Sequence, residues 1–137
     1  MSPQVVGMVV TERGSTGALR PAEKAALHDV LAAERDGAVL QIAGLTRDWD
    51  AIVESSAGVA VDDEHDPEGA TIAFERAQVH GLLTRAHAHL ADLERALGRL
   101  DEGRYGVCES CGSPIAAERL AARPAAATCI GCAAAPH

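Results

Sequence analysis

The sequence predicts a mainly α-helical protein: a long antiparallel helical hairpin (a coiled coil), followed by a small C-terminal module built on four cysteines. Three observations predict this fold. Aromatic residues are only 2% of the 137 residues, so a thick globular core is not expected. Two long segments repeat apolar residues at helical spacing, and all four cysteines lie close to the C-terminal end.

The first helix is expected from about Ala22 to about Ser55, after a flexible N-terminal arm at residues 1–19. Pro21 suits the first helical turn, and Glu23 suits the positive end of the helix dipole. The apolar residues of this segment recur at spacings of three and four, with Trp49 expected to pack near the far end of the hairpin. They are Leu27, Val30, Leu31, Val39, Ile42, Leu45, Trp49, Ile52 and Val53.

The connector between the two helices is expected to form an acidic tip near residues 58–68. Residues 47–68 hold eight acidic residues and one arginine, so this stretch carries −7 of the net charge of −8. Asp66 suits the N-cap of the next helix, and Pro67 suits its first position. Acidic connectors between helices are usually only solvated, so the charge alone leaves the role of this tip open.

The second helix has the most regular pattern in the chain. Its apolar residues alternate steps of four and three, which is a heptad seam. They are Val79, Leu83, Ala86, Leu90, Leu93, Leu97 and Leu100. Neither helix can bury its stripe alone, so residues 20–103 are expected to form the antiparallel hairpin. At 1.5 Å per residue, residues 68–101 span roughly 50 Å, which would place the tip far from the cysteines.

Residues 104–137 are expected to form a zinc finger. Cys108 and Cys111 make one Cys-x-x-Cys pair, and Cys129 and Cys132 make a second. Two such pairs separated by a short loop are typical of tetrahedral Zn²⁺, because each pair supplies two thiolates from one turn. Gly112 can adopt the positive φ that such a turn needs. Four thiolates leave no position for water, so the single predicted Zn²⁺ is structural.

Disulfides and a redox dithiol are the alternatives for these cysteines. The chain opens without the basic and long apolar regions of a signal peptide, which predicts a cytoplasmic protein and disfavours disulfides. No βαβ pattern surrounds either pair, which disfavours a redox dithiol. Another soft metal or a labile thiol pair remains open. No apolar run approaches the ~20 residues that span a bilayer, so no membrane association is expected.

The charge and the residue inventory narrow the function. A net charge of −8 and a pI near 5.1 oppose a general nucleic-acid binder, which needs a basic surface to neutralise phosphates. The chain contains no recognisable nucleophile–base pair, open metal site or phosphate loop, so an enzyme is not expected.

His80, His87 and His89 lack partners at ligand spacing and are expected on the surface or in the seam. Arg119 is expected to cap or pair locally.

The run YGVCESCGSPIAAERLAARPAAATCIGC resembles the zinc finger of the DksA/TraR family of bacterial transcription regulators. The segment DDEHDPEGATIAFER, with the heptads after it, is similar to the shorter DksA-like proteins of high-GC Gram-positive bacteria. Together these segments and the hairpin cover about residues 20–132. Beyond the cysteines, the shared positions of the finger are Tyr105, Gly106, Gly112, Ile115, Arg119, Leu120, Ala122 and Pro124.

The resemblance implies a protein that binds RNA polymerase directly and not specific promoter DNA. The coiled coil would enter the secondary channel and bring its acidic tip to the catalytic centre. Asp63 and Asp66 match the family tip motif Asp-x-x-Asp-x-Ala, whereas Glu68 stands where Ala is expected. The implied partner-binding residues are Asp62, Asp63, Asp66 and Glu68. A nucleic-acid-binding zinc ribbon and a plain helical adaptor remain the alternative functions.

Overall fold

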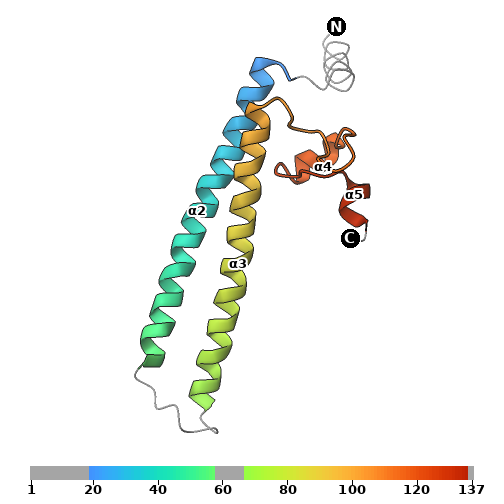
Figure 1. Ribbon diagram of the computed structural model, residues 1–137. Helices are drawn as coiled ribbons and strands as arrows, with labels where there is room; N and C mark the ends of the chain where they lie inside the picture. The colour runs from blue at the N-terminus through green and yellow to red at the C-terminus, as the bar shows by residue number, and fades with distance from the viewer. Residues whose placement is uncertain (1–18, 58–66, 136–137) are drawn as a thin grey trace. The chain divides into compact units, whose positions relative to one another are not determined.

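The structure is a computed structural model that describes residues 19–57 and 67–135 (Figure 1). The helices of this part are α2 (Pro21–Ala57), α3 (Pro67–Asp101), α4 (Ala117–Ala122) and α5 (Ile130–Ala134). Nearly all of the predicted N-terminal arm and of the predicted acidic tip lies outside the described residues. Among the helices described, none is long and apolar enough to cross a membrane.

α2 begins where its sequence supplies a cap. The Arg20 backbone N–H donates a hydrogen bond to the Glu23 carboxylate at 3.1 Å, and the Lys24 N–H donates to the Arg20 carbonyl at 2.9 Å. Arg20 is therefore the N-cap, and the carboxylate at the third helical position closes one half of a capping box. Pro21 stands at the first helical position, as predicted, because the N–H that it lacks has no intrahelical partner there.

α3 ends in a glycine cap of the Schellman type. Gly103 has a φ of 78°, and its N–H donates to the Leu100 carbonyl at 3.2 Å. The Arg104 N–H donates to the Arg99 carbonyl at 2.8 Å, which completes the motif. The left-handed conformation turns the chain sharply out of the helix, so the finger starts only a few residues after the last helical turn.

The chain forms two compact units. The first, called here the finger unit, comprises residues 1–34 and 92–137, and the second, the hairpin unit, comprises residues 35–91. α2 and α3 each contribute residues to both units. In the finger unit the buried hydrophobic side chains come from both helices and from the cysteine module. They are Leu31, Leu93, Ala96, Leu97, Leu100, Tyr105, Cys108 and Ile115.

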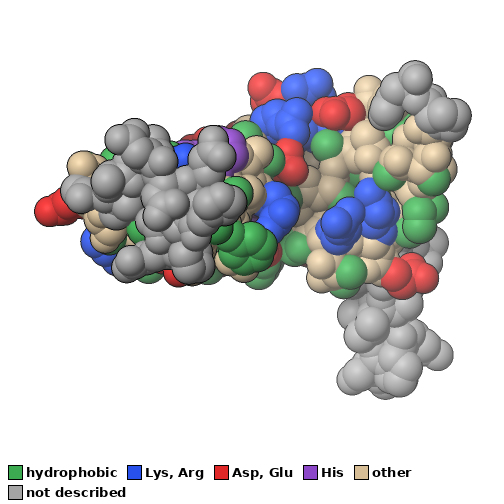
Figure 2. Space-filling model, turned by 90° about the horizontal axis from the view of Figure 1, so that it is seen from below, with side chains coloured by type: hydrophobic (Ala, Val, Ile, Leu, Met, Phe, Trp, Pro, Cys, Tyr) green, Lys and Arg blue, Asp and Glu red, His purple; other side chains and the backbone are tan. Residues whose placement is uncertain are grey.

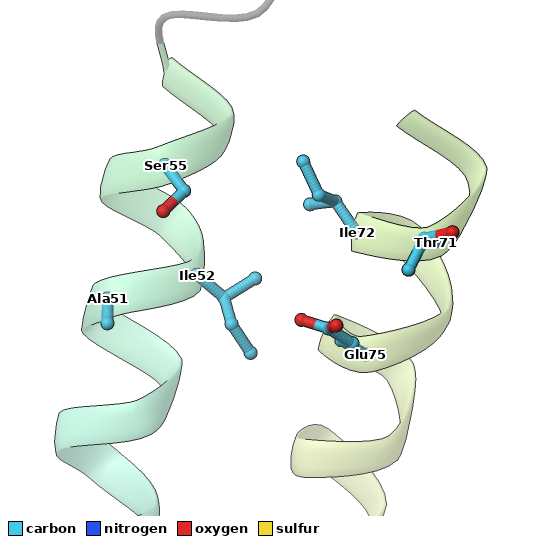
Figure 3. A pocket seen from close by; sticks show the side chains of 6 residues that line it. All are labelled: Ala51, Ile52, Ser55, Thr71, Ile72 and Glu75. Atoms are coloured by element: carbon cyan, nitrogen blue, oxygen red, sulfur yellow. The ribbon is translucent and has the colours of Figure 1, made fainter. Parts of the chain in front are cut away.

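In the hairpin unit α2 and α3 run antiparallel side by side (Figure 1). The rings of Trp49 and His80 lie tilted with their centroids 6.0 Å apart, which confirms that the tryptophan packs within the hairpin. Further along, the two helices border an open cleft of about 560 Å³, into which Ile52 and Ile72 point from opposite sides (Figure 3). Its lining is completed by Ala51, Ser55, Thr71 and Glu75.

The predicted seam is confirmed for α3 and partly wrong for α2. All seven heptad residues of α3 are buried or half-buried. In α2, however, Val30, Val39 and Val53 are 48%, 48% and 42% exposed, whereas Ala38 is only 4% exposed. One residue along a helix is a rotation of about 100°, so Val39 points away when its neighbour lies in the seam. The prediction chose the larger apolar residue, Val39, whereas the residue that lies in the seam is the neighbouring Ala38.

Candidate metal centre

The first cysteine pair lies in a tight turn closed by a two-residue β-bridge. Val107 and Pro114 pair in antiparallel fashion, and the Cys108 N–H donates to the Ser113 carbonyl at 2.8 Å. Inside the turn the Gly112 N–H donates back to the Cys108 carbonyl at 2.9 Å. Gly112 has a φ of 77°, as predicted, and a side chain would strain this conformation.

The second cysteine pair uses a short helix instead of a bridge. Cys129 is the N-cap of α5, and its sulfur accepts a hydrogen bond from the Cys132 backbone N–H at 3.5 Å. The Ala133 N–H donates to the Cys129 carbonyl at 2.9 Å and begins the helical turn. Because Cys132 follows three residues after the cap, its sulfur lies on the same side of the turn.

The structure brings the four cysteines into one cluster. Their sulfur atoms all lie within 4.8 Å of one another, and the sulfurs of Cys111 and Cys129 are 3.8 Å apart. A disulfide needs about 2.05 Å, and all four cysteines are free, so the disulfide alternative does not hold. With Zn–S bonds of about 2.3 Å, the edge of a tetrahedral S₄ site measures about 3.8 Å. The cluster therefore fits one zinc ion.

The thiols of this cluster differ in how readily they lose their protons. The backbone N–H of Cys129 lowers the pKa of the Cys108 thiol to about 6, and the side chain of Ser113 lowers the pKa of Cys111. A hydrogen bond with the Cys129 thiol raises the pKa of Cys132 to about 12. The first ionisation is thus favoured, whereas the last is opposed by its neighbours. A divalent cation offsets this opposition, because it binds thiolates and displaces their protons.

Three further contacts hold the loop between the two cysteine pairs. The Tyr105 hydroxyl donates to the Pro124 carbonyl at 2.7 Å, and the Arg119 Nε–H donates to the Thr128 carbonyl at 2.9 Å. The latter confirms the expected local pairing of that arginine. The Glu109 N–H donates to the Ala127 carbonyl at 2.9 Å. Burial raises the pKa of Tyr105, helped by the Glu34 carboxylate of α2, so this hydroxyl stays a hydrogen-bond donor at neutral pH.

The other predicted site residues are those of the acidic tip. Asp62, Asp63 and Asp66 lie outside the described residues. Glu68 lies in the first turn of α3, and its side chain is not described. Across residues 19–57 and 67–135, the four cysteines are the one group of three or more possible ligands close enough for a metal ion. His80, His87 and His89 of α3 are exposed.

Arg99 is a residue of this site that the sequence analysis did not single out. Its side chain reaches from α3 to the chain segment around the first cysteine pair. The sequence signal for this role is weak. It consists of an arginine that lies four residues before the glycine that caps the helix, in a helix followed closely by a Cys-x-x-Cys pair. Arginines near helix C-termini usually interact with the helix dipole alone, so no local pattern connects this one to the cysteines.

Comparison with known proteins finds similarity both for the finger and for most of the chain. A family model described as the prokaryotic dksA/traR C4-type zinc finger matches residues 103–135. The structure of the transcription factor DksA2 from Pseudomonas aeruginosa matches over 82% of this chain and 81% of that chain, with a TM-score of 0.67 and 26% identity. The finger of this chain is therefore similar to the C4-type zinc finger of the DksA/TraR family. Its cofactor is a structural Zn²⁺, because a C4-type finger and four clustered sulfurs require one metal ion.

Two curated relatives each match part of this chain. The protein YteA of Bacillus subtilis is 39% identical over 66 residues, which are 48% of this chain and 28% of that protein. The RNA polymerase-binding transcription factor DksA of Escherichia coli is 45% identical over 40 residues, 29% of this chain and 26% of that protein. This chain thus spans less than a third of the length of either relative.

The charges of the finger are balanced. Residues 102–135 contain three arginines and three glutamates. On the face shown in Figure 2, the basic and acidic side chains of the described residues lie intermixed. The arginines and glutamates of the finger therefore cancel in net charge.

Proposed function

We propose that this chain binds RNA polymerase and regulates the initiation of transcription. The observation that carries the proposal is the fold match to the transcription factor DksA2, which spans four-fifths of both chains. The finger match supports it, because the E. coli relative is named an RNA polymerase-binding transcription factor. Contact with the enzyme, and not with promoter DNA, suits a chain with a net charge of −8.

In this proposal one Zn²⁺ is held by Cys108, Cys111, Cys129 and Cys132. The distances between their sulfurs support this ligand set. When bound, the ion supplies a fixed crosslink between two turns, because four thiolates leave no coordination position for water or substrate. The cysteines thus serve to hold the finger in one conformation, and no catalytic step is assigned to them.

The acidic tip is the proposed effector of the protein. Residues 20–103 would form the hairpin that enters the secondary channel of the polymerase, and residues 104–137 the finger. Asp62, Asp63, Asp66 and Glu68 would face the catalytic centre. The support is the concentration of a −7 charge in residues 47–68, together with the resemblance of the tip to the family motif. Carboxylates there would act by their field on a catalytic Mg²⁺ or on basic residues of the channel.

Co-purification of the full chain with its cognate RNA polymerase tests this proposal. We expect a stoichiometric complex that forms without DNA and is displaced by a known secondary-channel ligand. Failure to bind the polymerase would overturn the proposal. DNA binding that is lost steeply with rising salt, in the absence of polymerase, would instead support the nucleic-acid-binding alternative.

A further inference from the structure

One guanidinium group joins the end of α3 to the first cysteine pair. The Arg99 side chain donates hydrogen bonds to the backbone carbonyls of Arg104, at 3.1 Å, and of Val107. Its Nη1 lies 3.8 Å from a carboxylate oxygen of Glu109. Only 11% of this side chain is exposed, whereas Arg95, one turn earlier in the same helix, is 63% exposed in its own ion pair.

The partners of this guanidinium belong to the metal centre. Val107 directly precedes the first cysteine, and Glu109 lies between Cys108 and Cys111. The backbone N–H of Glu109 also donates to the Ala127 carbonyl, two residues before Cys129. A single side chain of α3 therefore contacts the turn that supplies the first two sulfurs. That turn is itself hydrogen-bonded to the segment that leads into the second cysteine pair.

We propose that Arg99 is a positioning residue for zinc and couples metal binding by the finger to the last turn of α3. The inference rests on the proposed ligand set of four cysteines. Contacts that fit the cysteine turn only in its metal-binding shape lower the free energy of the bound state, so they raise the affinity for zinc. By linkage the reverse also holds: zinc stabilises the contacts and with them the end of the helix.

The coupling depends on the shape of the arginine side chain and not only on its charge. The Nη2 of the guanidinium donates to both carbonyls and its Nη1 faces the carboxylate, and the planar arrangement of donors fixes the angles between these contacts. The ammonium of a lysine is a compact charge on a flexible stem and cannot span the same three acceptors. Arginine and lysine carry the same positive charge and would attract the thiolate cluster equally. Replacing Arg99 with lysine therefore tests the shape of the side chain while its charge stays the same.

The test is a zinc titration of the full chain against a competing chromophoric chelator. Residues around metal ligands commonly change metal affinity by about 10- to 100-fold when mutated. Because Arg99 contacts the cysteine turn and not a ligand atom, we expect R99M to bind zinc about tenfold more weakly. R99K should recover only part of this loss, and E109Q should show a smaller loss, since both carbonyl contacts remain. The matched control is R95M, which removes an exposed arginine from the same helix and should bind zinc like the wild type.

Hydrogen exchange supplies a readout that does not depend on activity. In the wild type, zinc should increase the protection of amides in residues 97–107, and in R99M this increase should be clearly smaller. Equal zinc affinity of R99M and the wild type, or an equal loss in R95M, would refute the coupling. A wild-type chain that binds no zinc would instead refute the ligand set. If R99M does not fold, the comparison of R99K and E109Q with R95M decides the question by the same criteria.

Discussion

The finger unit and the hairpin unit share two helices but differ sharply in how they are stabilised. Of the ten buried hydrophobic residues in the described part of the chain, eight lie in the finger unit. The hairpin unit contributes two, and both are alanines: Ala38 and Ala86. Its larger apolar side chains, such as Trp49 and Leu83, are only half-buried.

This difference shows which unit supplies most of the buried apolar surface among the described residues. A fully buried leucine contributes about 1.5–3 kcal/mol, whereas alanine has little apolar area to bury. The finger unit adds a metal centre and the hydrogen bonds of Tyr105, Arg99 and Arg119. The hairpin unit leaves Leu40 and Phe74 73% and 69% exposed. The larger apolar side chains of the hairpin unit are thus less buried than those of the finger unit.

The largest expected effect is loss of the metal. The side chain of Cys111 is exposed. If it did not bind a metal, replacing it with serine would change the free energy of unfolding by less than about 0.5 kcal/mol. As a zinc ligand it shares in a binding free energy of about 10–16 kcal/mol. We expect C111S to lose stoichiometric zinc and the cooperative unfolding of the finger unit, measured by elemental analysis and hydrogen exchange.

The control for this variant is S110A, an exposed neighbour in the same turn. It should keep one zinc ion per chain and the wild-type protection of the finger amides. If C111S retained zinc with unchanged affinity, the proposed ligand set would be wrong. If S110A lost zinc as well, the turn itself and not the ligand would account for the effect.

A matched pair of core substitutions compares the two units directly. Leu93 is 0% exposed in the finger unit, and Leu83 is half-buried in the same heptad stripe of the hairpin unit. L93A should lower the free energy of unfolding by about 2–5 kcal/mol, because it leaves a cavity. L83A should lower it by only about 1 kcal/mol. Urea denaturation monitored by circular dichroism measures both, and equal losses would contradict the contrast between the units.

A smaller effect is expected from the hydroxyl of Tyr105. Y105F removes the donor to the Pro124 carbonyl and leaves that partly buried acceptor without it, which costs about 1–2 kcal/mol. F74L alters a side chain that is 69% exposed in the hairpin unit and should change stability by less than about 0.5 kcal/mol. Thermal unfolding of the zinc-loaded chains compares the two. A larger loss in F74L would show that the hairpin unit has packing beyond the residues described.

Much of this organisation is predictable from sequence, and the exceptions have physical reasons. Heptad spacing identified seven buried or half-buried residues of α3, because its apolar residues repeat regularly, but it missed the buried Ala96. The same reasoning placed Val39 in the seam of α2, but the buried residue there is Ala38. Where two helices approach closely, a small residue fits at the seam, so choosing the larger apolar residue gives the wrong position. The cysteine spacing predicted the metal centre and the positive φ of Gly112. The contacts of Arg99 depend on the path of the chain after the Gly103 cap, which no local pattern determines.

The smallest expected effect on stability belongs to the tip, where the largest effect on function is expected. D63N with D66N keeps the size of both side chains and removes two charges, so unfolding should change by less than about 0.5 kcal/mol. Binding to polymerase should persist, because the rest of the hairpin is unchanged, while the effect on transcription initiation should be largely lost. D48N with D50N is the matched control, since it removes two exposed charges from α2 in the same acidic stretch. Transcription that responds equally to both pairs would mean that total charge acts, and unchanged transcription in the tip variant would mean that the tip is passive.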